Sequence, residues 1–427
     1  MGSLNRTYKI IVLILGLIAL GALVDAYKLR KEISQTDKTA AVLGSRDIPY
    51  EEQVPPIFPT DKPDENAPIK VCQYDDVLER EIAPIDPNDN IQKNIGYQNN
   101  KVGLYIYAEV GEFTDLAAEM VNSNGGEWGY VLIPYNVKDY NETRWGQLFD
   151  RLAEKKLIPI VQLWDLDFNE QGKRDEQIKD SARFLNKLKW PIKQRYISVY
   201  NETNDKNFWR GTINPEEYAQ VLDETIDAFK EQSGDFFMLN GAFNSSARTG
   251  NDTLDEETYL IRMNKKIPDI FKKLDGWASH PYPQPNFSGS PKATGRDSIR
   301  AYEWELNILN KRFGVKDLPV FITETGWAHK ESEADTNGES VAYRLNQYQV
   351  ADNFKYAFEE VWLKDDRVVA VTPFTIRYNP PHDHFSWVTV NNNPYAQFEA
   401  IKNIKKVKGK PQTVTYYRSQ VLECNYE

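Results

Sequence analysis

The sequence predicts a (β/α)₈ barrel, and its apolar pattern supports this in three ways. Eight short apolar runs recur along the chain from about residue 101. They span 102–107, 129–134, 158–163, 196–200, 236–240, 276–279, 319–323 and 368–372. Each run is continuously apolar rather than alternating, as expected for parallel strands buried on both faces. Longer segments with helical periodicity separate the runs, and eight such units over about 310 residues fit this barrel.

The helical segments supply the other half of the βα alternation. Amphipathic patterns cover 143–155, 175–188, 215–231, 297–312 and 340–363, among others. A doubly wound α/β sheet is the alternative, but such folds usually have a glycine-rich phosphate turn after an early strand. Neither G-x-G-x-x-G nor a Walker A sequence occurs in the chain. Because barrel active sites lie at the C-terminal ends of the strands, the prediction also locates the functional residues.

Residues 1–33 are predicted to be a signal-anchor. An uninterrupted apolar run of 15 residues at 10–24 follows Arg6 and Lys9, which is the order of an export signal. The run is shorter than the roughly 20 residues that span a bilayer comfortably. We expect an uncleaved anchor with the bulk of the chain outside the cytoplasm. A cleaved signal peptide, which would give a secreted protein, is the main alternative, and a buried soluble helix is a third interpretation.

Residues 34–100 are predicted to be a Pro-rich linker and lead-in, and residues 101–427 a catalytic domain with a short C-terminal tail. Six prolines between positions 49 and 68 lie among polar residues without apolar periodicity, as in an extended spacer. Cys72 and Cys424, the two cysteines, flank the predicted barrel. Because export favours oxidation, we expect them to form a disulfide, and two free thiols are the alternative.

Composition and charge exclude several classes of protein. The 52 Lys+Arg against 63 Asp+Glu give a net charge of −11, so the chain lacks the basic surplus that nucleic-acid binding needs. A hydrophobic content of 41% excludes a wholly disordered chain. Ten Trp, 24 Tyr and 19 Phe exceed what a core needs. Flat aromatic faces suit sugars, although a large core with some surface tyrosines is the alternative.

Two carboxylates stand directly after predicted strands. The fourth run, YISVY, is followed by Asn201 and Glu202, and the seventh run, PVFIT, by Glu324. A carboxylate pair at one barrel mouth is what cleavage of a glycosidic bond needs, one as acid/base and the other as nucleophile or base. A salt bridge or helix cap at the rim is the alternative for either residue taken singly.

The segments VYNETND, WASHPYP and FITETGWA resemble those of clan A glycoside hydrolases over roughly residues 101–407. The resemblance implies a retaining β-glycosidase with Glu202 as acid/base and Glu324 as nucleophile. It also implies that Asn201 hydrogen-bonds the sugar 2-hydroxyl, and that His280 and Tyr282 belong to the site, the tyrosine hydrogen-bonding the nucleophile. Because the nucleophile must stay ionised, we expect hydrogen bonds and positive neighbours to lower the pKa of Glu324.

Three tryptophans are further candidates for binding sugar: Trp164 comes directly after the third run, and Trp327 and Trp387 follow the seventh and eighth. Core packing is the alternative for each of them. The sequence HDH at 382–384 has a spacing that suits a metal, but a catalytic zinc needs a third protein ligand. We therefore interpret it as a loop that lines the sugar cleft, and we expect neither a metal nor a cofactor.

These observations together predict a membrane-tethered retaining β-glycoside hydrolase that acts on a polysaccharide, by endo cleavage. The sequence leaves open whether the substrate is a β-glucan, mannan, xylan or galactan, because loops rather than the catalytic pair decide among them. A transglycosylase and a non-catalytic carbohydrate-binding barrel are the alternative functions, and a structural envelope protein is a third. The oligomeric state is also left open.

Overall fold

The computed structural model describes residues 70–84, 99–108, 111–166, 171–331, 344–379 and 383–426. Nearly all of these belong to one compact unit, Cys72–Glu423. The predicted anchor at 10–24 lies outside the described residues. Within the described ranges, no helix is both long and apolar enough to cross a membrane.

Eight parallel strands form a closed barrel, which confirms the predicted fold. The strands are β2 (Gly103–Tyr105), β3 (Gly129–Asn136), β4 (Leu157–Trp164), β5 (Arg195–Val199), β6 (Phe236–Asn240), β7 (Trp277–Ser279), β8 (Val320–Ile322) and β9 (Val368–Val371). They pair in sequence order as two sheets, β2 to β6 and β7 to β9. Parallel bridges between Leu239 and Gly276 and between Val102 and Val371 join the two sheets and close the barrel.

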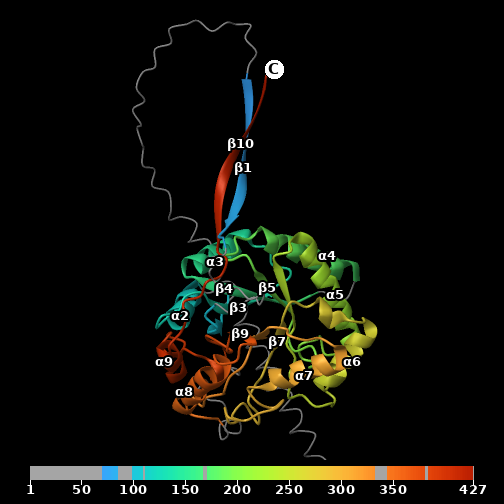
Figure 1. Ribbon diagram of the computed structural model, residues 1–427, viewed down its shortest axis with the longest axis vertical. Helices are drawn as coiled ribbons and strands as arrows, with labels where there is room; N and C mark the ends of the chain where they lie inside the picture. Colours follow the sequence, from blue (N-terminus) through green and yellow to red (C-terminus); the bar gives the residue numbers. More distant parts are fainter. Residues whose placement is uncertain are drawn as a thin grey trace, which may run out of the picture. The chain divides into compact units, whose positions relative to one another are not determined.

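Helices follow the strands and surround the barrel (Figure 1). They are α2 (Gly111–Val121), α3 (Glu142–Glu154), α4 (Gln171–Lys187), α5 (Pro215–Gln232), α6 (Glu256–Lys266), α7 (Ala301–Phe313), α8 (Gln347–Tyr356) and α9 (Ala396–Asn403). The helix predicted at 340–363 begins later, because the Asn346 side chain caps α8 by accepting from the N–H groups of Tyr348 and Gln349. A π-helical segment, Ala357–Trp362, continues it. The helix predicted at 297–312 begins at Ala301.

Aromatic side chains fill the inside of the barrel. Tyr196 lies near the centre of this cluster, with ring centroids 5.2 Å from Phe237, 5.1 Å from Phe321 and 5.9 Å from Tyr130. All four side chains are at most 4% exposed. The barrel is therefore a packed core and not a pore.

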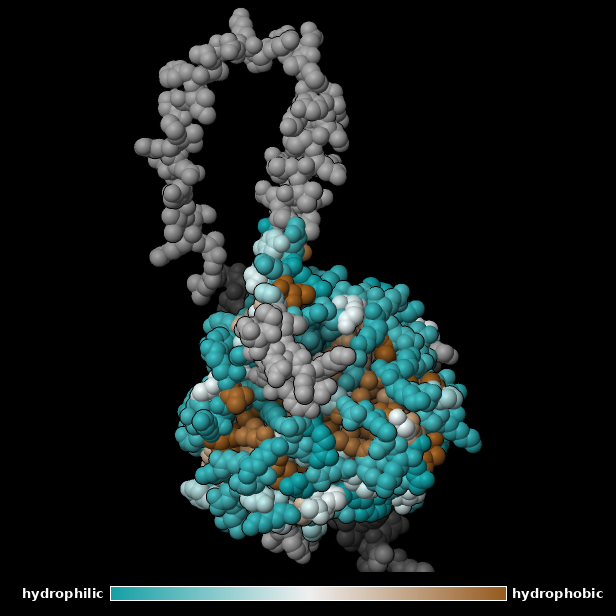
Figure 2. Space-filling model, in the orientation of Figure 1, coloured by the Kyte–Doolittle hydropathy of each residue, from teal (hydrophilic) through white to brown (hydrophobic). Residues whose placement is uncertain are grey.

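A second apolar layer joins the strands to the helices. Tyr218 of α5 illustrates it, since its buried hydroxyl donates to the carbonyl of Val199 at 2.9 Å and accepts from the N–H of Gly241 at 2.7 Å. One helix thus fixes the ends of β5 and β6. The outer helix faces are polar, and Figure 2 shows hydrophilic residues over most of the described surface on one side.

The predicted linker at 34–100 contains a strand, β1 (Lys70–Ile82), which differs from a purely extended spacer. It pairs with β10 (Val414–Tyr426), which forms most of the predicted C-terminal tail. The N–H of Ala83 donates to the carbonyl of Thr413 at 2.9 Å, so the end of β1 meets the start of β10 and the ladder is antiparallel. Cys72 and Cys424 lie on these two strands, but their side chains are outside those described, and the disulfide stays a prediction.

Candidate active site

The turn after β5 positions Glu202. Tyr200 and Glu202 have φ angles of 73° and 36°, so the chain leaves the strand through the left-handed region. The N–H of Glu202 donates to the carbonyl of Ala242, just after β6, at 2.8 Å. Gly241 lets the end of β6 come this close to the end of β5, because a Cβ at position 241 would lie 2.5 Å from the carbonyl oxygen of Val199. The Glu202 side chain is thereby held at the C-terminal end of the barrel.

Glu324 follows β8 and is held by the loops on either side. The hydroxyl of Tyr282 donates to Oε2 of Glu324 at 3.1 Å. The hydroxyl of Thr325 donates to the carbonyl of Pro281 at 2.8 Å, and the Thr325 carbonyl accepts from the N–H of Phe374 at 3.1 Å. The loops after β7 and β9 therefore fix the segment that carries Glu324. Glu324 itself is only 7% exposed.

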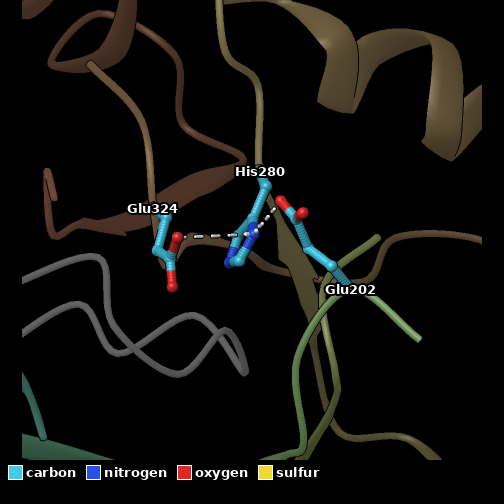
Figure 3. A group of neighbouring side chains, drawn as sticks. All are labelled: Glu202, His280 and Glu324. Atoms are coloured by element: carbon cyan, nitrogen blue, oxygen red, sulfur yellow. Dashed lines mark hydrogen bonds and ion pairs between the residues drawn. The ribbon is translucent and has the colours of Figure 1, made fainter. Parts of the chain in front are cut away.

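His280 lies between the two carboxylates (Figure 3). Its Nδ1 is 2.9 Å from Oε1 of Glu202 and 3.8 Å from Oε2 of Glu324. One donor atom from each of the three residues lies within 4.8 Å of the others, a spacing that would also suit a divalent cation. The hydrogen bond between His280 and Glu202 accounts for the close approach of these two residues.

Burial decides the ionisation of Glu324. Burial and, to a smaller extent, the charge of Glu202 raise the pKa of Glu324, and the net value is about 7. His280, Tyr282 and Gln162 lower it, as the sequence led us to expect, but they do not outweigh burial, so the expected net lowering is wrong. Burial also favours neutral His280, yet the charges of Glu324 and Glu202 prevail and raise the pKa of the imidazole above its ordinary value. Glu324 therefore gains and loses its proton near neutral pH.

A chain of three polar side chains orients Asn201. The indole N–H of Trp164 donates to Oε1 of Gln162 at 2.8 Å, and the Gln162 amide donates to Oδ1 of Asn201 at 3.1 Å. With its oxygen occupied, the Asn201 amide presents its N–H groups as donors. Asn201 lines the same cavity as the two glutamates.

The cavity over the carboxylates has a volume of about 400 Å³, within the ordinary range for ligand sites. Most of its lining side chains are aromatic. The lining comprises Tyr105, Tyr107, Pro134, Trp164, Asn201, Glu202, Phe208, Asn244, Tyr282, Gln284, Phe287, Glu324, Phe374, Tyr378 and Phe385. A mostly apolar wall with a few convergent polar groups suits a sugar, which has apolar C–H faces and polar edges.

The structure brings most of the predicted site residues together at this cavity, but two tryptophans lie elsewhere. Trp327 and Trp387 are each 1% exposed and do not line the cavity. Their rings pack on Phe354 of α8, with centroids 5.0 and 4.8 Å from it. Both tryptophans therefore pack in the core and do not bind sugar in the cavity, which was the alternative interpretation for each of them. In the 382–384 segment, position 382 lies outside the described residues, and Phe385 just beyond it lines the cavity.

Sequence reasoning missed several lining residues. Tyr105 and Tyr107 lie in the C-terminal half of the first apolar run, close to where a barrel places its active site, but no catalytic chemistry singled them out. Asn244, Gln284 and Phe208 lie in long loops, and no sequence pattern places those loops over the cavity. Only the folded chain brings them there.

Comparison with solved structures finds similar folds. A monomeric β-xylosidase from Caulobacter crescentus CB15 has a TM-score of 0.51 at 16% identity, covering 77% of this chain and 71% of that one. A GH128 (subgroup II) endo-β-1,3-glucanase from Pseudomonas viridiflava has a TM-score of 0.46 at 17% identity, covering 71% and 97%. Thermotoga maritima Cel5A, in complex with a mannotriose substrate, has a TM-score of 0.45 at 13% identity, covering 70% and 96%.

Of these three proteins, the β-xylosidase alone has a TM-score above 0.5, and 16% identity limits the likeness to the fold. That likeness agrees with the (β/α)₈ barrel that the sequence predicted. No protein-family model and no curated protein matches the sequence.

Proposed function

We propose that this protein is a retaining β-glycoside hydrolase. The observation that supports this most directly is the placement of Glu202 and Glu324 on either side of His280, at the base of an aromatic cavity. One carboxylate oxygen of Glu202 lies within 4.8 Å of one carboxylate oxygen of Glu324. Retaining enzymes have carboxyl groups about 5–5.5 Å apart, whereas inverting enzymes leave about 6.5–9.5 Å for a water molecule. The spacing favours double displacement.

In the first step, ionised Glu324 attacks the anomeric carbon while protonated Glu202 gives its proton to the departing glycosidic oxygen. The Tyr282 hydroxyl orients the attacking carboxylate through its 3.1 Å hydrogen bond. Once the glycosyl ester has formed, Glu324 no longer carries a charge, and Glu202 is left as a carboxylate. In the second step, Glu202 takes a proton from water, the oxygen attacks the anomeric carbon, and the bond to Glu324 breaks.

A polysaccharide substrate and endo cleavage belong to the proposal. The aromatic wall supplies faces on which sugar rings stack. A panel of β-glucan, mannan, xylan and galactan, followed by product sizing, tests both points. Release of internal fragments supports endo action, and release of single sugars from chain ends contradicts it. Binding without release would instead favour a carbohydrate-binding barrel, and products longer than the substrate would favour a transglycosylase.

Azide rescue tests the two catalytic roles. Glu324→Ala leaves space beside the anomeric carbon, so azide should attack there directly and yield the α-glycosyl azide from a β-linked substrate with a good leaving group. Glu202→Ala should still form the intermediate, and azide should then yield the β-azide. Glu231→Ala, at an exposed position near the end of α5, is the control and should retain wild-type turnover. The same anomer from both active-site variants would contradict the assignment.

We also propose that the apolar segment 10–24 tethers the enzyme to a membrane, with the catalytic domain outside the cytoplasm. The support is the order of basic and then apolar residues in the sequence. The full chain should then sediment with membranes and resist extraction by alkaline carbonate. Mature protein that begins near Tyr27 in the medium would contradict the tether and leave the catalytic proposal intact.

A further inference from the structure

A second, more open hollow adjoins the aromatic cavity. It has a volume of about 640 Å³ and shares the lining residues Asn244 and Gln284 with that cavity. Its other lining residues come from the loops after β6 and β7: Ser246, Ala247, Arg248, Pro285, Asn286 and Asp297. In contrast to the aromatic cavity, six of its eight lining residues carry polar side chains. We call it the polar compartment.

The polar compartment lies on the Glu202 side of the site. The N–H of Glu202 donates to the carbonyl of Ala242, two residues before Asn244. Asn204, two residues after Glu202, exchanges hydrogen bonds with Asn244 at 3.0 Å in both directions. Because the acid/base residue protonates the departing oxygen, the space beside it is where the leaving-group portion of a substrate would extend.

The loop that forms the compartment is held in place before any ligand binds. The guanidinium of Arg296 donates to the carbonyls of Ser245 and Ala247, each at 2.8 Å, and to the Asp255 carboxylate at 2.6 Å. Its central carbon, Cζ, also lies over the Trp304 ring, 4.3 Å from the centroid. A loop fixed in this way loses little entropy on binding, which is what a specific site requires.

Charge and hydrogen-bonding capacity indicate the kind of ligand. Arg248 and Asp297 form an ion pair at 2.7 Å, so the compartment offers no uncompensated charge from its lining. Within the described parts of the chain, the side-chain amides of Gln284 and Asn286 form no hydrogen bond. Each amide offers donors and an acceptor, and such groups match the hydroxyls of a neutral sugar.

We infer that the polar compartment binds a neutral sugar unit on the leaving-group side of the scissile bond, through the amides of Gln284 and Asn286. This inference rests on the proposed hydrolase function and deepens it. The substrate is then a chain that continues past the cleaved linkage, rather than a single sugar joined to a small leaving group. Aromatic stacking holds the part of the substrate in the main cavity, and hydrogen bonds hold the part beyond it.

The test compares two substrates that differ only on the leaving-group side. A β-glycosyl fluoride presents no sugar to the compartment, whereas a β-linked oligosaccharide does. Gluco-, manno-, xylo- and galacto-oligosaccharides of two to four units are each paired with the matching fluoride. The measured quantity is kcat/KM for the oligosaccharide divided by kcat/KM for the fluoride. Removing either amide, and with it one or two neutral hydrogen bonds to the sugar, should lower this ratio roughly tenfold.

The variants are chosen to preserve the fold. Gln284→Ala removes one amide, and Asn286→Gly removes the other while tolerating the φ of 55° at that position. Gln232→Ala is the matched control, because Gln232 ends α5 just before β6, at the opposite end of the barrel. The control should leave the ratio at the wild-type value. Thermal unfolding of each variant checks that the fold is retained.

The outcomes separate the two proposals. A ratio that falls in both Gln284→Ala and Asn286→Gly supports the inference. If the wild type cleaves a fluoride and its oligosaccharide but neither variant changes the ratio, the inference is wrong and the hydrolase proposal stands. If no fluoride and no oligosaccharide is cleaved, the proposed function itself fails. Faster cleavage of β-linked oligo-uronates than of neutral chains would contradict the neutral character of the sugar.

Discussion

Glu324 should destabilise the fold at neutral and alkaline pH, and replacing it with Gln should remove this cost. Burial raises the pKa of Glu324 to about 7 from an ordinary 4.5. The folded protein therefore holds this proton more tightly than the unfolded chain does. As the pH rises from about 4.5 to 7, the unfolded chain releases the proton first and the free energy of unfolding falls. Above pH 7 both states have lost the proton and the cost stays constant.

The size of the effect follows from the two pKa values. At 1.36 kcal/mol for each pH unit, the full cost is about 3 kcal/mol at pH 8, and at pH 5 it is about 1 kcal/mol. Gln has nearly the same shape and can still accept the Tyr282 hydrogen bond. The stabilisation by Glu324→Gln should therefore grow by about 2 kcal/mol between pH 5 and pH 8. Equilibrium urea unfolding, followed by tryptophan fluorescence at both pH values, measures it.

Glu231→Gln, at an exposed position on α5, is the control for this experiment. Its free energy of unfolding should differ from that of the wild type by the same small amount at both pH values. Equal effects of Glu324→Gln at pH 5 and pH 8 would refute the reasoning, because they would mean that Glu324 ionises as readily in the folded protein as in the unfolded chain.

Three further substitutions test neighbouring parts of the site and fold. Tyr282→Phe removes a hydrogen bond that lowers the pKa of Glu324, so kcat/KM should fall about tenfold or more and its acidic limb should move to higher pH in a pH–rate profile. Tyr218→Phe leaves the Val199 carbonyl and the Gly241 N–H without their buried partner and should cost about 2 kcal/mol in urea unfolding. Gly241→Ala places a Cβ 2.5 Å from the Val199 carbonyl oxygen, so kcat and the thermal midpoint should both fall; a fully active variant would show that the strand ends can separate freely.

The sequence by itself determined the barrel, because its strands and helices are local patterns. Each buried parallel strand appears as a continuous apolar run, and the chain contains eight of them with helices between. Because barrel active sites lie at the C-terminal ends of the strands, the positions of the strands then located Glu202 and Glu324 without any knowledge of distances. Local patterning also identified Trp164 as a residue of the cavity wall, since it directly ends β4.

The tertiary structure alone decided the properties that depend on contacts between distant residues. The sequence predicted a lowered pKa for Glu324, but burial, which no local pattern reports, raises it to about 7. Trp327 follows Glu324 by three positions, yet Phe354 of a distant helix covers its ring. The pairing of β1 with β10 joins segments more than 300 residues apart; the sequence suggested a disulfide between these segments but no strand in either of them. Burial, ring packing and strand pairing between the two ends of a chain exist only once the chain has folded.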